Sequence, residues 1–207
     1  YLTCNTPGRR SELLNGLWYC GVRNYPDIGT FWDKYSLKLK TQYSVWGKDT
    51  VWSYVTGLIR RYKPEVIVTH DINGEYGHGA HRVCADACLQ CVKWAANPDR
   101  YTKSVKAWGV WQPKKLYVHL YGDKEERTRM DWTVPLESMG GKTGLELAIE
   151  AYRKHRTQMS LTITVGGQKR PLSVQGTGKT FSNTSFGLYA TTVGPDVEHT
   201  DFLEHVD

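Results

Sequence analysis

The chain has 207 residues, 27 Lys and Arg against 21 Asp and Glu, and a formal net charge of +6. Hydrophobic residues make up 40% of it, with 8 Trp and 13 Tyr, a composition that excludes a disordered polypeptide. No apolar run is long enough to cross a bilayer, and the basic residues are scattered, so we expect neither a transmembrane segment nor a nucleic-acid-binding face. The length suits one domain with a sizeable core, and we expect residues 1–207 to form it.

The N-terminal third predicts two helices separated by a loop. The chain starts at Tyr1, and "YLT" resembles the end of a strand. The segment "RRSELLNGLWYCG" is typical of a short amphipathic helix closed by Gly21, and the Pro-, Gly- and Asp-rich residues 23–35 predict a loop. The pattern of "DTVWSYVTGLIRRYKP" predicts a helix that Asp49 or Thr50 caps and Pro64 ends.

The following residues alternate between strands and helices. "EVIVTH" predicts a short strand buried on both faces, and a helix carrying three cysteines follows it. "KKLYVHLY" predicts another strand, "MDWTVPL" one more, and "GLELAIEAYRKH" a helix. This alternation favours an α/β fold with a mostly parallel sheet.

The region 160–185 is rich in Gly, Thr and Ser, and predicts a loop or hairpin excursion. Within it, "VQGTGKT" resembles the tail of a phosphate-binding loop, but Ser173 stands where that loop needs a glycine. "GGKT" at Gly140 fails in the same way, because Leu136 occupies the corresponding position. We therefore expect both segments to be turns.

Cys84, Cys88 and Cys91 have the C-x3-C-x2-C spacing that also marks radical enzymes with an iron–sulfur cluster. The local periodicity is helical, however, and places the three thiols on one apolar face. We expect them to be small core residues, and keep the iron–sulfur radical enzyme as the less favoured alternative. The cysteines indicate no particular compartment.

The stretch "THDINGEYGHGAHR", residues 69–82, places three histidines between the first strand and the next helix. In open parallel sheets, ligands bind beyond the carboxyl ends of strands. His78 and His81 are three residues apart, so both rings can converge on one pocket, as zinc ligands or as acid and base. The alternative is a helix cap built from polar loop residues. A catalytic zinc site needs three protein ligands, and the sequence shows no complete set.

The longer stretch "PEVIVTHDINGEYGHGAHR" resembles the second metal motif of the PIG-L (LmbE-like) family of zinc-dependent N-acetylglucosaminyl deacetylases. "RRSELLNGLWYCGV" resembles the R-x-x-E helix of that family, with Arg9 and Glu12 in the motif positions, and "NYPDIG" resembles its loop with an acid, here Asp27. "AYRKHRTQ" resembles its alanine–histidine–glutamine helix through His155 and Gln158. "FGLYATTVGPDVEHTDFLEHV" resembles the tail of family members, so the resemblance covers nearly the whole chain.

The resemblance implies a Rossmann-like α/β sandwich and removal of the acetyl group from an N-acetylated sugar or glycoconjugate, with zinc as cofactor. It implies that His81 is a zinc ligand and that His78 is the catalytic histidine, which stabilises charge or protonates the leaving amine. Tyr76 resembles a mobile tyrosine that reaches the carbonyl oxygen.

The resemblance also implies roles around this centre. Arg9 and Asp27 correspond to sugar contacts, and His70 and Asp71 to groups that support the metal ligand. The alternative for Arg9 is a structural ion pair with Glu12. For His155, in the helix motif, we expect a satisfied, partly buried histidine.

The chain departs from the family pattern in two respects. Gly79 and Ala80 stand where many members have Pro-Asp, so an orienting carboxylate is lost. The first metal motif, His-Pro-Asp-Asp or His-Ala-Asp-Asp, is absent, and we expect it upstream of "YLT" in a chain truncated at its N-terminus, with the first strand missing. A noncatalytic sugar-binding remnant is the alternative function. The sequence does not indicate which sugar is the substrate, or the compartment.

Overall fold

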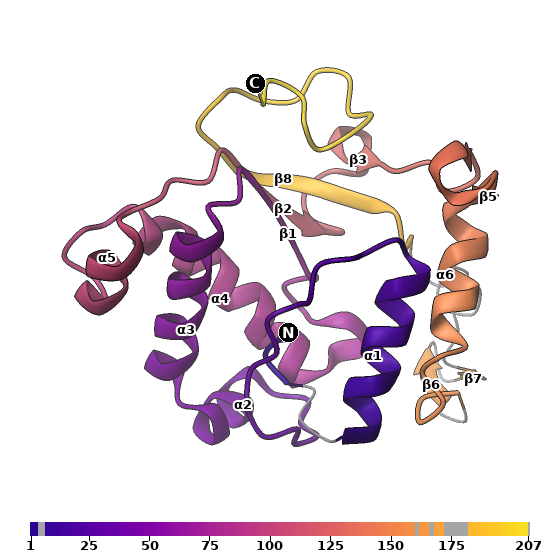
Figure 1. Cartoon of the computed structure of the whole chain (residues 1–207), viewed down its shortest axis with the longest axis horizontal. Helices are drawn as coiled ribbons and strands as arrows, with labels where there is room; N and C mark the ends of the chain where they lie inside the picture. The colour runs from indigo at the N-terminus through magenta and orange to yellow at the C-terminus, as the bar shows by residue number, and fades with distance from the viewer. Residues whose placement is uncertain (4–6, 160–161, 166–167, 172–181, 207) are drawn as a thin grey trace. The chain divides into compact units, whose positions relative to one another are not determined.

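The computed structural model describes residues 1–3, 7–159, 162–165, 168–171 and 182–206. The chain divides into two compact units, of which the first comprises Tyr1–Asp33 and Asp131–Thr184, and the second Lys34–Met130 and Ser185–Asp207. Each unit is described by itself (Figure 1). Whether residues 1–207 form one domain stays a prediction.

Two packed helices, α1 (Pro7–Tyr19) and α6 (Gly144–Tyr152), form the main element of unit 1. The predicted end of α1 is confirmed, because Gly21 has φ 82° and its backbone N–H donates to the carbonyl of Trp18. Helix α6 begins with a capping box, in which Thr143 and Glu146 each accept a bond from the other's backbone N–H. Residues 1–3, predicted as a strand end, lie outside any strand and bond to the backbone of residues 29 and 31.

The other elements in the described part of unit 1 are short strands and one short helix. They are β4 (Pro135–Leu136), η3 (Glu137–Met139), β5 (Lys142–Thr143), β6 (Thr162–Val165) and β7 (Gln168–Pro171). The strand predicted for "MDWTVPL" is wrong over most of its length. Asp131 accepts hydrogen bonds from Thr133 in a turn, and within this segment only Pro135–Leu136 pairs with another strand, β5. The antiparallel β6–β7 pair confirms the predicted hairpin. In "GGKT", Gly140 and Gly141 form the predicted turn and Lys142–Thr143 is β5, whereas "VQGTGKT" lies outside the described residues.

Unit 2 contains four helices, α2 (Leu39–Trp46), α3 (Lys48–Tyr62), α4 (Gly79–Ala95) and α5 (Thr102–Trp108). Helices α3 and α4 confirm the predicted helices, but α2 and α5 were not predicted. The predicted N-cap of α3 is wrong, because Gly47 is the N-cap residue and no side chain caps it, while Asp49 lies inside the first turn. The predicted end is confirmed, because α3 ends at Tyr62 with Lys63 as its C-cap, directly before Pro64. No helix in the described part of the chain has the length and apolar character of a membrane span.

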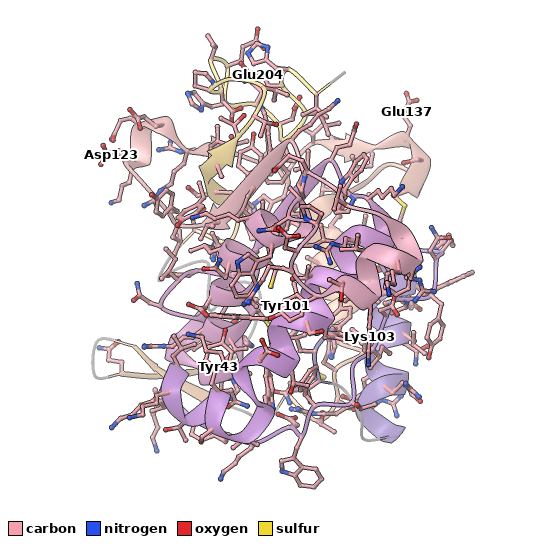
Figure 2. The ribbon with its side chains drawn as sticks, turned by 90° about the vertical axis from the view of Figure 1, so that its left-hand side faces the viewer. Tyr43, Tyr101, Lys103, Asp123, Glu137 and Glu204 are labelled. Atoms are coloured by element: carbon pink, nitrogen blue, oxygen red, sulfur yellow. The ribbon has the colours of Figure 1, made fainter. Side chains whose placement is uncertain are left out.

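Polar side chains connect these helices. Arg60 is fully buried on α3, and its guanidinium donates to the carbonyls of Trp94, Ala95 and Asn97 at the end of α4. A cation suits the C-terminal end of a helix, where carbonyls lack intrahelical partners. Two tyrosines labelled in Figure 2 make similar connections: Tyr43 on α2 donates to Asp86 on α4, and Tyr101 before α5 donates to Asp49 on α3.

The sheet of unit 2 has the strand order β1-β2-β8-β3, and α4 packs against β1 and β2. Its strands are β1 (Val66–Thr69), β2 (Lys115–His119), β3 (Thr128–Arg129) and β8 (Ser185–Thr191), and a short helix η2 (Lys124–Glu126) precedes β3. Only β1 and β2 are parallel, whereas β8 runs antiparallel to both β2 and β3. The structure therefore shows a mixed α/β arrangement, and the expected mostly parallel, Rossmann-like sheet is not confirmed. Strand β1 lies at an edge with Val68 exposed, so its predicted burial on both faces is not confirmed either.

A buried ion pair joins the middle of this sheet to the C-terminal segment. The Lys115 ammonium contacts the Asp196 carboxylate, and their side chains are 0% and 1% exposed. Tyr117 donates to the same carboxylate at 2.7 Å, and Phe202 packs on the Tyr117 ring at 4.7 Å between centroids. The segment after β8 is thus held on the face of β2 from which Lys115 and Tyr117 project.

Candidate functional site

The candidate site lies beyond the carboxyl ends of the two parallel strands. Thr69 pairs with Val118, so His70, which follows β1, and His119, the last residue of β2, stand at neighbouring strand ends. The connection from β1 to α4 contains the short helix η1 (Glu75–Gly77), in which Tyr76 has φ 58°. A positive φ is uncommon for a residue with a side chain, and it turns the chain sharply just before the two predicted site histidines.

The structure brings three imidazoles together. The His70 ring lies parallel to that of His81, with centroids 4.6 Å apart and an interplanar angle of 16°. The His78 ring meets His81 edge-on at 5.2 Å, and the Tyr76 ring lies 6.2 Å from His81. The predicted convergence of His78 and His81 is therefore seen in the geometry, while the chemical role of each residue stays a prediction.

The environment of His81 keeps its ring neutral. Burial, followed by the neighbouring His70 and His78, lowers the pKa of His81 to about 3. Its Nδ1 atom is buried and has no hydrogen-bond partner among the described residues. A neutral imidazole with a nitrogen lone pair is a good zinc ligand. Among the described residues, however, no three His, Cys, Asp or Glu side chains are placed to hold a metal ion. His81 therefore suits zinc as a single ligand, and the described residues do not complete a zinc site.

The cluster contains two residues that the sequence analysis missed, Glu75 and His119. His119 Nδ1 lies 2.8 Å from Glu75 Oε1, and His70 Nδ1 lies 3.5 Å from the same oxygen. Asp71, expected to support the metal ligand, accepts a 2.8 Å bond from the backbone N–H of Asn73, which shapes the loop, and its role at the ligand stays a prediction. The sequence does carry a signal for His119, because this residue ends the strand next to β1, where ligands bind in parallel sheets.

The structure gives a physical reason for Gly79, which replaces the proline common in the motif that this stretch resembles. The Gly79 backbone N–H donates to the carbonyl of Ser36 at 2.7 Å, a bond that proline cannot make. A Cβ atom at residue 79 would lie 2.2 Å from Ser36 Oγ. The start of α4, and with it the spacing between His78 and His81, depends on this close approach.

The predicted sugar contacts belong to unit 1. Arg9 forms an ion pair with Asp33, so the alternative partner, Glu12, is wrong. Glu12 instead accepts bonds from the backbone and hydroxyl of Thr157. The backbone carbonyl of Asp27 accepts a bond from the amino group of residue 1 at 2.8 Å, which positions the loop. Sugar contact by Arg9 and Asp27 stays a prediction.

His155 and the three helix cysteines have environments of structural residues. Burial lowers the pKa of His155, which is partly buried, as expected. Cys91 is fully buried and its thiol donates to the carbonyl of Trp52. Burial raises the pKa of Cys84 and Cys91 to about 12 and raises that of Cys88, which favours protonated core thiols over cluster ligands.

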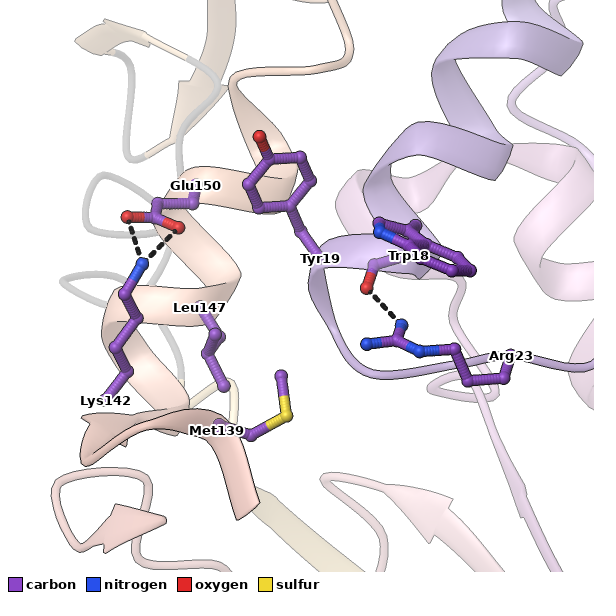
Figure 3. Close-up of a pocket in the computed structure, with 7 residues that line it drawn as sticks. All are labelled: Trp18, Tyr19, Arg23, Met139, Lys142, Leu147 and Glu150. Atoms are coloured by element: carbon purple, nitrogen blue, oxygen red, sulfur yellow. Dashed lines mark hydrogen bonds and ion pairs between the residues drawn. The ribbon is translucent and has the colours of Figure 1, made fainter. Parts of the chain in front are cut away.

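Unit 1 contains a pocket of about 340 Å³ between the end of α1 and the start of α6 (Figure 3). Trp18 is 60% exposed there, and the Arg23 guanidinium covers its ring at 4.1 Å. Lys142 and Glu150 form an ion pair at 3.0 Å on the opposite wall. The lining residues are Trp18, Tyr19, Arg23, Met139, Lys142, Leu147 and Glu150, and none of them is a predicted site residue.

No family model matches the chain. A 1D-myo-inositol 2-acetamido-2-deoxy-alpha-D-glucopyranoside deacetylase 1 from Frankia casuarinae is 31% identical over 166 residues, which is 67% of this chain and 51% of the relative. Its namesake from Frankia alni is 28% identical over 131 residues, 50% of this chain and 44% of the relative. A deacetylase of the same name from Segniliparus rotundus is 31% identical over 111 residues, 52% of this chain and 32% of the relative.

The chain spans about half the length, or less, of these curated relatives. The three relatives share the name of a deacetylase acting on an acetamido-glucopyranoside of inositol. Over part of its length, the chain is therefore similar to curated sugar deacetylases.

Proposed function

We propose that the protein hydrolyses the acetamide of an N-acetylglucosamine-type sugar or glycoconjugate, as a zinc-dependent deacetylase of the PIG-L type. The observation that carries the proposal is the imidazole cluster at the carboxyl ends of β1 and β2, in a chain similar to curated deacetylases of an acetamido sugar. Amide hydrolysis needs a group that stabilises the developing oxyanion and an acid that protonates the leaving amine.

Three residues of the cluster have chemical roles in this proposal. His81, whose buried Nδ1 lacks a partner among the described residues, supplies one ligand nitrogen for zinc. His78, edge-on to it, stabilises charge or donates the proton to the amine. Tyr76 is 44% exposed, so its hydroxyl can approach the carbonyl oxygen of a bound acetamide. Zinc, when bound, would supply a Lewis acid for the carbonyl and lower the pKa of water.

Acetate release from the full-length protein tests the proposal. The substrates are N-acetylglucosamine, its inositol glycoside, a glycolipid and a polysaccharide end, each assayed with zinc and after treatment with a chelator. We expect acetate from at least one substrate, and loss of the activity on chelation that zinc restores. A complete panel without acetate release from zinc-supplemented protein would overturn the assignment.

Sugar binding without turnover is the second candidate. Two observations favour it: the described residues hold no complete set of metal-binding groups, and unit 1 has a pocket with an exposed indole beside charged groups. Aromatic rings with a few polar groups suit small-molecule binding. This candidate predicts that Trp18→Ala weakens sugar binding in calorimetry, whereas Trp32→Ala, at an exposed tryptophan that does not line the pocket, leaves it unchanged.

A further inference from the structure

The Glu75 carboxylate contacts two histidines that stand at the ends of neighbouring strands. One oxygen, Oε1, lies 2.8 Å from His119 Nδ1 and 3.5 Å from His70 Nδ1, and accepts a 3.2 Å bond from the backbone N–H of Asp71. The side chains of Glu75 and His119 are 14% and 8% exposed. Glu75 therefore connects the ends of both parallel strands, and its contact with His119 has little access to water, whereas the His70 side chain is 40% exposed.

The charge state of Glu75 determines which nitrogen of His119 carries the proton. Burial by itself would raise the pKa of Glu75, but the bonds from His119 and His70 outweigh it and hold that pKa far below its usual range. A carboxylate only accepts hydrogen bonds, so His119 must donate from Nδ1. Its Nε2 then carries the lone pair when the ring is neutral.

The contact reaches the proposed zinc ligand through His70. The His70 ring is tied to Glu75 at one edge and lies flat on His81 at 4.6 Å. Ala80, between the two site histidines, has no polar side chain that could orient either ring. Glu75 is thus placed to fix the plane of His70, against which the His81 ring is packed.

We propose that Glu75 is a positioning residue of the site, which fixes the tautomer of His119 and the ring plane of His70, and through His70 the orientation of His81. The proposal rests on the proposed function for its effect on turnover, but its effect on the histidines is independent of it. Removal of a group that orients a metal ligand typically lowers activity or metal affinity by about 10–100-fold.

The test compares Glu75→Leu, which removes the acceptor, with Glu75→Gln, which keeps an acceptor oxygen at similar volume. Imidazole nitrogen NMR on the full-length protein, at a pH high enough for the His119 ring to be neutral, reports the neutral tautomer directly. We expect His119 to be protonated at Nδ1 in the unsubstituted protein and in Glu75→Gln, and to lose this preference in Glu75→Leu. On the sugar substrate, kcat should fall about 10–100-fold in Glu75→Leu and far less in Glu75→Gln.

The unsubstituted protein alone can overturn the proposal, whether or not the variants fold: a neutral His119 ring with its proton on Nε2 contradicts it. A Glu75→Leu protein with unchanged tautomer, or with changed tautomer and unchanged kcat, also overturns it. The two proposals can fail separately. If the tautomers behave as expected but neither the unsubstituted protein nor the variants release acetate, the proposed function is contradicted. The assignment of Glu75 as the residue that orients the histidines is then still supported.

Discussion

The His70 ring lies flat against the His81 ring, with centroids 4.6 Å apart and planes inclined by 16°. His70 comes from the end of β1 and His81 from the first turn of α4, so the stacked pair closes the connection between strand and helix. Two protonated imidazoles in this position would repel each other, which is one reason why the pKa of His81 lies below its ordinary value. The arrangement keeps a neutral imidazole available at the proposed site.

Substitution of the two motif histidines should separate metal binding from turnover. In the full-length protein, His81→Ala should lose zinc, because it removes a ligand, whereas His78→Ala should keep most of the zinc and lose about 10²-fold or more in kcat. Metal content and acetate release, measured for both variants, test the separate roles of the two histidines. His205→Ala, at an exposed histidine, is the control. Equal zinc loss in His78→Ala and His81→Ala would contradict the separate roles.

Gly79→Ala should destabilise the protein by about 1–3 kcal/mol, because the new Cβ would meet Ser36 Oγ and force the start of α4 to move. The control is Gly8→Ala, since a Cβ on Gly8 has no atom within 4 Å and alanine favours a helix. Urea unfolding of both variants measures the difference. A Gly79→Ala protein as stable as Gly8→Ala would show that the close approach to Ser36 has no energetic consequence.

Asp196→Ala should be strongly destabilising, by about 3–5 kcal/mol, because it leaves the fully buried Lys115 ammonium without its counter-charge. Asp123→Ala, at an exposed aspartate of the same unit, should change the free energy of unfolding by less than about 0.5 kcal/mol. Combining Asp196→Ala with Lys115→Met should recover part of the lost free energy of unfolding, since no unpaired buried charge remains. A double variant less stable than Asp196→Ala alone would argue against this explanation.

The cysteines of α4 should react slowly with iodoacetamide. A raised thiol pKa means less thiolate at a given pH: at pH 8, a thiol of pKa about 12 is ~10⁻⁴ thiolate, against ~10⁻¹ for an ordinary thiol of pKa about 9. Labelling of Cys84 and Cys91 should therefore be slow at pH 8 and accelerate as pH rises, while the exposed Cys20 reacts first. Mass spectrometry of the native protein, with urea-unfolded protein as the control, measures this. Rapid native labelling of Cys84 would favour accessible, ligand-like thiols.

Local patterns predicted the helices and strands that have clear sequence signals. Gly21 ends α1 and the apolar spacing of residues 51–62 forms α3, as expected from local chemistry. The direction of β8 could not be predicted, because it depends on pairing with β2, more than sixty residues earlier in the chain. The sheet was therefore expected to be mostly parallel, whereas long-range pairing makes it mixed.

In the candidate site, too, local contacts could be predicted from the sequence and long-range contacts could not. The spacing of His78 and His81 indicated that their rings converge, because three residues span about one helical turn. The contact between Glu75 and His119 was not predicted, because it joins the loop after β1 to the end of β2, 44 residues later in the chain. Asp71 was predicted to support the metal ligand because of its position in the motif, although an aspartate followed by a turn commonly bonds to its own loop.

The most direct test of the proposed function is hydrolysis of an N-acetylglucosamine glycoside by the zinc-loaded, full-length protein in water enriched with heavy oxygen. Amide hydrolysis transfers one oxygen of water to the acetyl carbon and leaves the sugar with a free amine. We predict labelled acetate and free amino sugar in equal amounts, and the loss of both in His78→Ala. A glycoside that binds to the protein but is recovered with its acetyl group intact would contradict the proposed deacetylation.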